Sequence, residues 1–357
     1  MSNRAWMSMM GLVMLAMPLH AYASGFANTD LSASAAGVAN AFVATANDAS
    51  AMAFNPAGIA WQDGVSLMAT GSLIRTRNAS LKTPAAVYPD SFGTLRPTSD
   101  VFATVMPHTS NLGFGLSYVS AFDADNNWSL MGNGFGVNDV NIHRLSADAV
   151  YAVSSSLALA IGGDWYYGRA VLNQGGSGFD GRTKSGAFGG NAALMWRPWY
   201  GWSFGLMGRA VRGLKFSGGG RTLTMQLPEE LTVGVAHDLT DNIRLELDAD
   251  WLRWAALKKL AVVSEMAGLT WTWRPNATFR LGYAFDAGTG TASNFNPALD
   301  SVNGHRISFG SGFDAFGFHT DVSYSYTFYP NKTVAGLVPG TFRDRRQALL
   351  VSISKVF

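Results

Sequence analysis

The residues of this sequence whose types and spacing could do chemistry are a short N-terminal motif and a ladder of charged side chains. Asn55-Pro56-Ala57 joins a residue that favours a helix N-cap to a proline suited to the first helical position. Within 244–250, one Arg and three acidic residues occupy alternate positions, so on a strand they would share one face. Facing a lumen, they would line an ion path or form internal ion pairs. Because an unpaired buried charge is costly, we expect pairing with Arg209, Arg280 or Arg306.

Signals for an enzyme or a cofactor are weak. The chain has no Cys, and its six His residues show no HExxH or paired spacing, so no metal site is indicated. Gly132–Gly136 is glycine-rich but lacks the strand-to-helix context of a dinucleotide-binding loop. Ser is plentiful, which makes a chance Ser–His pair a non-specific signal for a hydrolase. A formal net charge of +2 without a long basic run argues against nucleic acid as a partner.

The N-terminus has the pattern of a secretory signal. Arg4 supplies a positive n-region, residues 5–19 an apolar h-region, and Ala21-Tyr22-Ala23 a small-residue cleavage site. The apolar run is shorter than the ~20 residues that a membrane-spanning helix needs, and no other run is long enough. We predict a signal peptide over 1–23 and a mature chain that begins at Ser24.

Residues 24–60 are the stretch around which the rest of the chain is organised. They include thirteen alanines and no Lys, Arg or Glu. Apolar residues spaced i, i+4, i+7 and i+11 from Leu31 to Phe42 predict a helix, with Thr29 or Asp30 as its N-cap. Further helix starts are expected near 47 and 55. Short helices of small residues cannot build a core of their own, so we predict that they plug a container formed by the rest of the chain.

The container shows the period of β-strands. From 64 onward, runs of about ten residues alternate apolar or aromatic side chains with small or polar ones. In 316–329, for example, Phe318, Tyr324 and Phe328 share one parity. We predict strands at 65–76, 101–107, 111–122, 142–153, 157–170, 186–197, 201–212, 230–239, 242–254, 267–274, 277–286, 304–313, 316–329 and 347–357.

These strands favour a membrane barrel over a soluble sandwich. Tight connections alternate with long ones, as short periplasmic turns and long external loops do in barrels. A soluble sandwich would leave the large apolar parity in water in strand after strand. The predicted fold class is an all-β transmembrane barrel of fourteen antiparallel strands, with an N-terminal, partly helical plug in its lumen. The predicted divisions are a signal peptide over 1–23, the plug over 24–61 and the barrel over 62–357.

Several motifs resemble those of one family. They are Gly25-Phe26, Asn47-Asp48-Ala49-Ser50, Phe54-Asn55-Pro56-Ala57-Gly58, Leu227-Pro228-Glu229 before a strand, the strand 278–286, and the final strand ending in Phe357. In these features the chain resembles the FadL/TodX family of outer-membrane hydrocarbon transporters. The resemblance covers both ends and the second half of the chain, whereas the loops between them match poorly.

The resemblance implies a fourteen-stranded barrel closed by an N-terminal hatch that carries an Asn-Pro-Ala sequence. It also implies an apolar ligand pocket and sideways exit through an opening that a strand kink makes in the barrel wall. Asn55 would either act as a helix cap alone or also bond to a lumen strand and hold the hatch shut. The hatch and gating residues that the resemblance implies are Asp48, Phe54, Asn55, Pro56, Ala57 and Gly58.

Arg280 and Arg306 are the candidate ligand-binding residues. Both lie on the polar parity of consecutive predicted strands. A carboxylate ligand would need a lumen cation, because a charge-assisted hydrogen bond in an apolar pocket is strong and directional. The alternative is that these arginines only pair with Asp248 or Asp250.

We therefore predict a monomer, surrounded by outer-membrane lipid in a Gram-negative bacterium, that passively transports hydrophobic molecules. The sequence does not decide whether the ligand is a long-chain fatty acid or a related hydrocarbon. It also does not decide whether the ligand is released laterally into the membrane or into the periplasm. A general water-filled porin is the alternative, and a barrel hydrolase is a more distant one. An aqueous channel needs no apolar N-terminal stopper, which argues against the porin. The protein is predicted not to be an enzyme and to need no cofactor.

Overall fold

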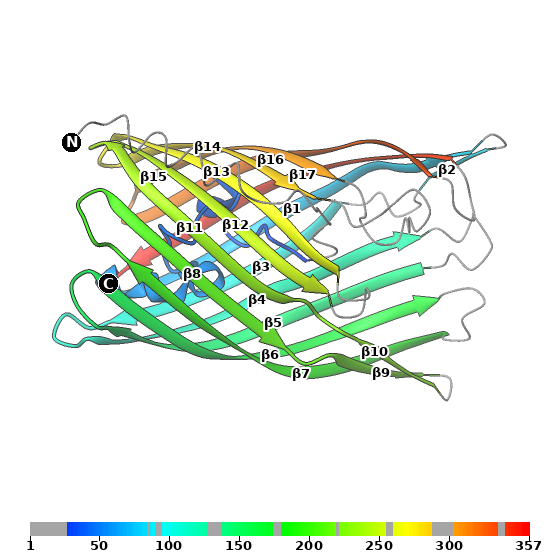
Figure 1. The fold of residues 1–357 in the computed structure, drawn as a ribbon, viewed down its shortest axis with the longest axis horizontal. Helices are drawn as coiled ribbons and strands as arrows, with labels where there is room; N and C mark the ends of the chain where they lie inside the picture. Colours follow the sequence, from blue (N-terminus) through cyan, green and yellow to red (C-terminus); the bar gives the residue numbers. More distant parts are fainter. Residues whose placement is uncertain are drawn as a thin grey trace.

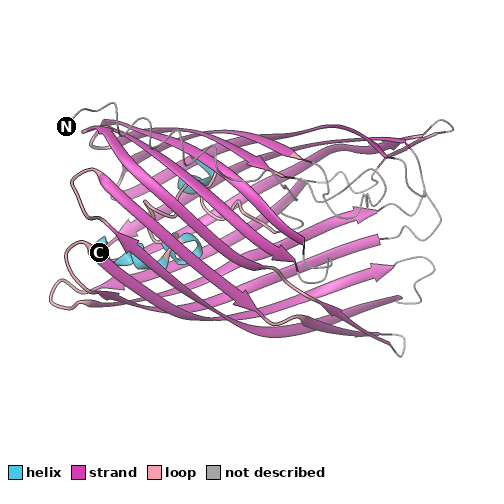
Figure 2. Cartoon of the chain, in the orientation of Figure 1, coloured by secondary structure: helices cyan, strands magenta, loops and turns pink. Residues whose placement is uncertain are grey.

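The structure is a computed structural model in which the chain forms a long, closed β-barrel with short N-terminal helices (Figures 1 and 2). It describes residues 27–83, 86–89, 95–127, 137–173, 180–218, 221–254, 260–287, 303–334 and 340–357. The predicted signal peptide, the Gly25-Phe26 motif and the glycine-rich run 132–136 lie outside the described residues.

The barrel wall has fourteen strands in the described residues. They are β1 (Gly64–Lys82), β3 (Leu95–Met106), β4 (Leu112–Asn127), β5 (Val137–Ala152), β6 (Leu157–Asn173), β7 (Asp180–Trp196), β8 (Trp202–Val211), β11 (Glu229–Thr240), β12 (Ile243–Trp254), β13 (Leu260–Arg274), β14 (Ala277–Asp286), β15 (Gly304–Ala315), β16 (Phe318–Val334) and β17 (Gly340–Val356).

The remaining elements are small. A short strand pairs with β1, and a two-stranded hairpin follows β8. Two α-helices and one 3-10 helix precede the first strand in the part of the chain that the structure describes. These elements are α2 (Ala33–Gly37), α3 (Ala51–Phe54), the 3-10 helix η1 (Pro56–Trp61), β2 (Val87–Pro89), β9 (Leu214–Gly218) and β10 (Arg221–Met225). Among the described residues, no helix is long and apolar enough to cross a membrane.

Wall strands that follow one another in the chain are neighbours in the sheet, and each pair is antiparallel. β8 pairs with β11 past the β9–β10 hairpin, and β17 pairs with β1 along fifteen residue pairs, which closes the sheet. The predicted fourteen-stranded antiparallel barrel is therefore confirmed. Closure removes the exposed strand edges that an open sheet would carry into a membrane.

The two ends of the barrel differ. At one end the connections are tight turns of two to five residues, at 107–111, 153–156, 197–201, 241–242, 275–276 and 316–317. The C-terminus lies at this end, on the left in Figure 1, and the longer connections lie at the opposite end. Short turns are the periplasmic feature of outer-membrane barrels, so we call this end periplasmic and the opposite one outer.

Side chains alternate between the lumen and the outside as the sequence predicts. On β16, Phe318 and Tyr324 are exposed, whereas Asp321, Ser323 and Ser325 are buried in the lumen. The same pattern recurs on β4, where the bulky parity is exposed and the glycine and serine parity is buried. The outer surface is therefore an apolar band that would be unstable in water and suits lipid.

Each predicted strand overlaps a strand of the wall, but several predicted strands are too short at their outer ends. β5 begins at Val137, β13 at Leu260 and β17 at Gly340, each several residues before the predicted start. The alternation is weak at these ends. Polar residues occupy both parities at the starts of β5 and β17, and apolar residues occupy both at the start of β13. The hairpin β9–β10 and the short β2 lie where long loops were predicted.

The long helix predicted from Leu31 to Phe42 is wrong in extent. The helix α2 ends at Gly37, and its N-cap is Ser32, whose hydroxyl accepts from the Ala35 N–H at 3.2 Å. Ala39 and Asn40 follow with φ of 54° and 69°, a backbone region that ends a right-handed helix. Residues 42–45 bind the barrel wall, as described below, and these contacts outweigh the preference of the local sequence for a helix.

Candidate functional site

The N-terminal segment, residues 27–62, lies inside the barrel. Nearly all of its side chains from 28 to 59 are buried, and it contacts strands on every side of the wall (Figures 1 and 2). The Ala33 N–H donates to Ser352 Oγ on β17 at 2.8 Å, and Ser203 Oγ on β8 donates to the Ala44 carbonyl at 2.6 Å. The segment therefore fills the periplasmic half of the lumen.

Four consecutive backbone N–H groups of residues 42–45 donate to two carboxylates of β12. The first two reach Asp248 Oδ2 at 2.7 and 2.8 Å, and the next two reach Glu246 Oε1 at 2.7 and 3.1 Å. The Thr45 hydroxyl also donates to Glu246. Five donors converge on these two buried carboxyl groups, so this cluster fixes residues 42–45 against β12.

The prediction that the charged ladder 244–250 pairs with arginines across the lumen is therefore wrong. Its first member, Arg244, pairs with Asp238 on the neighbouring strand β11 at 2.6 Å, and Asp250 accepts from Thr232 Oγ1 at 3.0 Å. Alternation in the sequence shows which side chains share a face. It does not show what lies opposite that face, which here is the backbone of the N-terminal segment.

Arg280 and Arg306, the predicted ligand-binding residues, are both engaged in ion pairs. Arg280 Nη1 lies 2.5 Å from Asp321 on β16. Arg306 Nη1 lies 3.1 Å from Asp30, which Arg346 on β17 also approaches at 3.3 Å. A carboxylate ligand at either arginine would have to displace a protein carboxylate. Asp30, expected only as a possible helix cap, instead joins the N-terminal segment to two wall strands.

Asp48 lies at the centre of a hydroxyl cluster within the segment. It accepts from the Ser50 N–H at 2.8 Å and from the hydroxyls of Ser50 and Ser34. Burial raises the pKa of the Asp48 carboxyl above its ordinary value, although these donors oppose the shift. The carboxyl fixes the turn before α3 to the start of α2.

Asn55 makes both contacts that the sequence left open. Its Oδ1 accepts from the Ala57 N–H at 3.1 Å as a helix cap, and Pro56 occupies the first position of η1. Its Nδ2 donates to the Val43 carbonyl at 2.7 Å and to the Leu194 carbonyl on β7 at 3.0 Å. Asn55 therefore joins η1, the 42–45 loop and the wall. Its role in gating stays a prediction.

The other motif residues pack the segment together. Phe54 meets Phe42 edge-on, with ring centroids 5.6 Å apart. Ala57 is fully buried. At Gly58 an added Cβ would lie 2.2 Å from the Ala46 carbonyl oxygen, so only glycine allows this approach. These contacts explain the motif structurally, through close packing of η1 on the 42–46 loop.

The wall is incomplete between β3 and β4. These strands pair along only five residue pairs, from Val101–Tyr118 to Val105–Phe114. Beyond Tyr118, β4 has a bulge between Ser120 and Phe122 and no longer pairs with β3. We call this interval the β3–β4 gap. At its outer limit Arg96 of β3 forms an ion pair with Asp123 of β4, so the gap is bounded on both sides.

Side chains and the N-terminal segment satisfy the backbone in the gap. The Ser120 N–H donates to Asp100 Oδ1 at 2.7 Å. Asn28 Nδ2 donates to the Ser120 carbonyl at 2.9 Å, and the Asn28 N–H donates to the Ala121 carbonyl at 2.9 Å. Ala27 forms a β-bridge with Phe122. The start of the N-terminal segment thus replaces part of a wall strand.

An apolar cluster lies on the outer side of the segment and adjoins the gap. Phe122 at the gap lies 6.3 Å from Tyr166, between ring centroids. Side chains of the β9 strand turn inward and are fully buried against the same cluster. Its members include Phe122, Val140, Ile142, Tyr166, Leu214, Phe216, Leu227 and Leu252. This lining presents mostly apolar surface, with the buried Arg144, Arg209 and Asp164 close to Tyr166.

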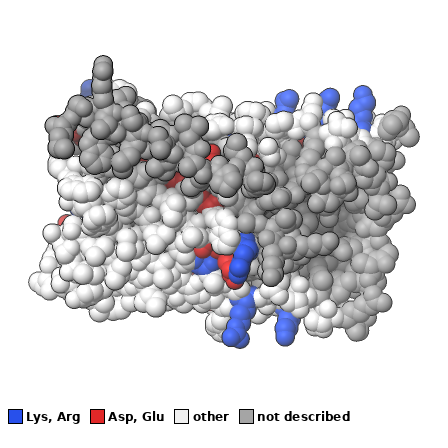
Figure 3. Space-filling view, in the orientation of Figure 1, with Lys and Arg blue, Asp and Glu red and all other residues white. Residues whose placement is uncertain are grey.

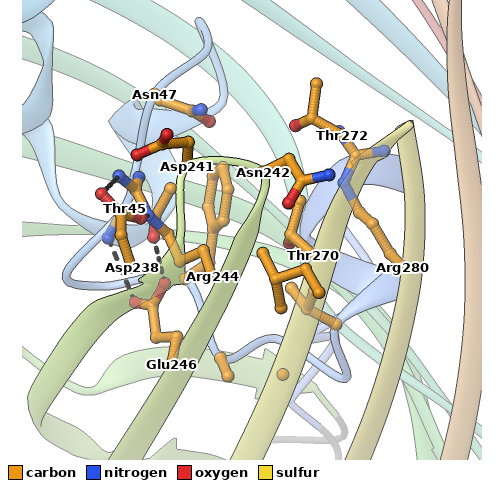
Figure 4. Close-up of a pocket in the computed structure, with 15 residues that line it drawn as sticks. Thr45, Asn47, Asp238, Asp241, Asn242, Arg244, Glu246, Thr270, Thr272 and Arg280 are labelled. Atoms are coloured by element: carbon orange, nitrogen blue, oxygen red, sulfur yellow. Dashed lines mark hydrogen bonds and ion pairs between the residues drawn. The ribbon is translucent and has the colours of Figure 1, made fainter. Parts of the chain in front are cut away.

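A polar cavity of about 230 Å³ lies on the periplasmic side of the segment (Figure 4). The loop 38–47 forms one side of it, and strands β12 to β14 form the other. Figure 4 shows Thr45 and Glu246 bonded to each other on one side of it, with Arg280 on the opposite side. The N-terminal segment therefore separates an apolar outer half of the lumen from a polar periplasmic cavity.

Solved structures with this architecture are known. A FadL homologue from Pseudomonas aeruginosa has a TM-score of 0.76 with 16% identity, over 94% of this chain and all of that one. The two chains share one barrel fold. Two toluene transporters have similar structures. TodX from P. putida has a TM-score of 0.69 with 13% identity, over 90% of this chain and 98% of that one. TbuX from Ralstonia pickettii has a TM-score of 0.67 with 14% identity, over 91% of this chain and 98% of that one.

The resemblance to the FadL/TodX family that the sequence predicted is therefore confirmed at the level of the fold. No family model matches the chain, and no curated protein matches it in sequence. Sequence reasoning missed Asn28, Asp100 and Asp30 as parts of the site. No local signal marks them, because each acts through a partner more than 19 positions away in the chain.

Proposed function

We propose that this protein passively carries hydrophobic molecules across the outer membrane of a Gram-negative bacterium, and that it is not an enzyme. The observation that carries the proposal is the β3–β4 gap, which joins the apolar cluster in the lumen and is filled by the start of the N-terminal segment. The solved barrels of this fold that are titled toluene transporters support it by analogy of fold.

The proposed path has two stages. A hydrophobic molecule enters from the outer end and binds the apolar cluster around Tyr166 and Phe216. Residues 27 and 28 then leave the β3–β4 gap, and the molecule leaves sideways into the lipid. Such a path keeps an apolar solute out of the polar periplasmic cavity, where it would lose the benefit of apolar surroundings.

In this proposal the hatch comprises residues 24–61, as the sequence predicts, and Asp48 and the 54–58 motif hold it together. Its contacts to β12 and β7 lie in the periplasmic half, so those contacts can remain while residues 27–28 move. The mature protein would begin at Ser24, act as a monomer and be surrounded by outer-membrane lipid. A water-filled porin is less well supported, because the buried segment occupies the lumen.

We further propose that the ligand is neutral. Among the described residues, the buried charged side chains comprise eight acids and three arginines. Arg306 pairs with Asp30, and Arg209 pairs with Asp164 at 3.0 Å and Glu230 at 3.7 Å. An anionic ligand would therefore find two of these three arginines already paired, and each ionised acid nearby would repel it strongly in a low-dielectric site.

One observation favours a fatty acid instead. Arg144 on β5 is 5% exposed, and its Nε and one Nη have no hydrogen-bond partner among the described residues. A buried guanidinium with free donors can bind a carboxylate. The Arg144→Leu variant separates the two candidates. Uptake of octane and octanoate should change little if the ligand is neutral, whereas octanoate uptake alone should fall if Arg144 binds a carboxylate.

Uptake by whole cells tests the transport itself. Cells that carry the protein in the outer membrane should take up labelled toluene or octane faster than cells with the empty vector. The uptake of a small sugar should stay the same. Faster sugar uptake would favour the porin, and equal uptake of both probes with and without the protein would contradict the proposal.

A further inference from the structure

Basic side chains project from the outside of the barrel near its outer end. Figure 3 shows Lys and Arg at the upper and lower edges of the molecule, mostly in the half away from the tight turns. Eight of them are exposed on the wall strands, on the β8–β9 connection and on β9. One group is Arg75, Lys82, Arg343 and Arg345 on β1 and β17, and the other is Arg169, Lys184, Arg212 and Lys215 on β6 to β9.

Each group brings like charges together. Arg169 on β6 and Lys184 on β7 are direct cross-strand partners, and both face outward. On β17, Arg343 and Arg345 share the outward face, with Arg75 on the neighbouring strand β1. Like charges placed directly opposite each other destabilise a sheet. The folded barrel alone therefore gives no reason for this arrangement.

None of the eight has a carboxylate within ion-pair distance in the part of the chain that the structure describes. The lumen arginines differ, since Arg280 and Arg306 each bind an acid. Arg253, which also faces outward, pairs with Glu229. The two basic groups are thus free to bind an anion from outside the protein.

The position of these basic residues along the barrel axis indicates which kind of anion they bind. Along the outward face of β6, Trp165 and Tyr167 precede Arg169, and on β1 Leu73 precedes Arg75. Aromatic residues mark the level where acyl chains meet head groups. Two residues along a strand advance about 7 Å, so the cations lie at the level of lipid head groups, just beyond the apolar band.

We propose that the two basic groups bind the phosphates of an anionic glycolipid in the outer leaflet. The guanidinium fork matches phosphate oxygens in a bidentate way, and the neighbouring apolar side chains contact the acyl chains of the same lipid. The bound phosphate offsets the repulsion between Arg169 and Lys184. The inference depends on the outer-membrane location proposed above and is independent of the transported molecule.

Native mass spectrometry of the detergent-purified protein with diphosphoryl lipid A tests the inference. The triple variant Arg75→Gln/Arg343→Gln/Arg345→Gln and the double variant Arg169→Gln/Lys184→Gln should each bind this lipid about tenfold more weakly. A matched control is Arg274→Gln/Lys355→Gln, which removes two cations at the periplasmic end and should bind like the original protein. Monophosphoryl lipid A should bind the original protein more weakly than the diphosphoryl form.

Heat-modifiability in gels shows whether each variant folds. If only one of the two outer-end variants folds, that variant alone is enough for the test. Equal binding by all variants, an equal loss in the control, or equal binding of phosphatidylethanolamine would overturn the inference. Uptake of hydrophobic probes is measured separately. Normal lipid binding without uptake would therefore contradict the transport proposal and leave this one intact.

Discussion

Two junctions of the barrel wall differ in how they are held. At the β1–β17 junction, where the barrel closes, the strands form fifteen residue pairs, with one register shift between Arg77 and Ser80. At the β3–β4 junction only five pairs are, and Asp100 and the Ala27–Asn28 backbone supply the remaining bonds. The first junction is continuous wall. The second is an interface between the wall and the N-terminal segment.

The difference shows where the wall can open at low cost. Opening β1–β17 would leave many backbone groups unpaired in hydrocarbon, at several kcal/mol each. The β3–β4 gap is already open at the backbone of β3, and on the β4 side Asn28 and Asp100 bind the backbone of Ser120. Movement of a short stretch of chain therefore suffices to expose the gap.

Deletion of residues 24–60 should have the largest effect. It removes every contact that the N-terminal segment makes in the gap and in the lumen, and leaves the β1–β17 junction unchanged. Because nothing then fills the lumen of a fourteen-stranded barrel, single-channel conductance in planar bilayers should rise about tenfold or more. Unchanged conductance in a folded barrel would show that the segment does not close the pore.

A cross-link across the gap should have the next largest effect. The chain has no Cys, so the pair Thr98→Cys and Ala121→Cys can be joined by a short bis-maleimide. If the gap is the exit, cross-linking should reduce uptake of toluene about tenfold, because opening would limit transport. The control pair Leu73→Cys and Leu349→Cys joins direct partners at the tight junction. Its cross-linking should leave uptake normal, and an equal loss in both pairs would exclude the gap as the exit.

The Asn28→Ala variant should weaken the seal without removing it. The Ser120 carbonyl would lose its partner, which costs about 1–3 kcal/mol for a buried group. Hydrogen exchange of residues 27–36 should therefore become faster, and exchange in β17 should not change. Asn47→Ala is the matched control, because Asn47 is an exposed asparagine of the same segment. Faster exchange in both variants would point to general loosening of the segment.

The smallest expected effect is a pH dependence at Asp48. Burial raises its pKa in the folded state, so its contribution to stability is fully present below the ordinary Asp pKa and is lost as pH rises through the folded value. Hydrogen exchange of residues 32–50, corrected for its intrinsic rate, should be more protected at pH 4 than at pH 8. Asp48→Asn should flatten this dependence, whereas the β1–β17 junction should show none in either protein. A dependence that persists in Asp48→Asn would assign it to another group.

Much of the barrel can be predicted from the sequence, because strand alternation is a local property. Phe318, Tyr324 and Phe328 face outward wherever the strand lies, so their period alone predicts the strand and its lipid-facing side. The cap at Asn55-Pro56 is local for the same reason, since the N-cap bond spans two residues. These features determined the fold class, the strand count and the start of η1.

Only the tertiary structure decided which side chains and backbone groups meet in the lumen. Glu246 and Asp248 bind backbone N–H groups of 42–45, some two hundred residues earlier in the chain, and every residue has such a donor except proline. No sequence pattern can mark a partner of that kind. The β3–β4 gap is hidden likewise. The alternation of β4 ends after Tyr118, where residues 119–122 are all buried, but only the register shows that pairing with β3 stops there.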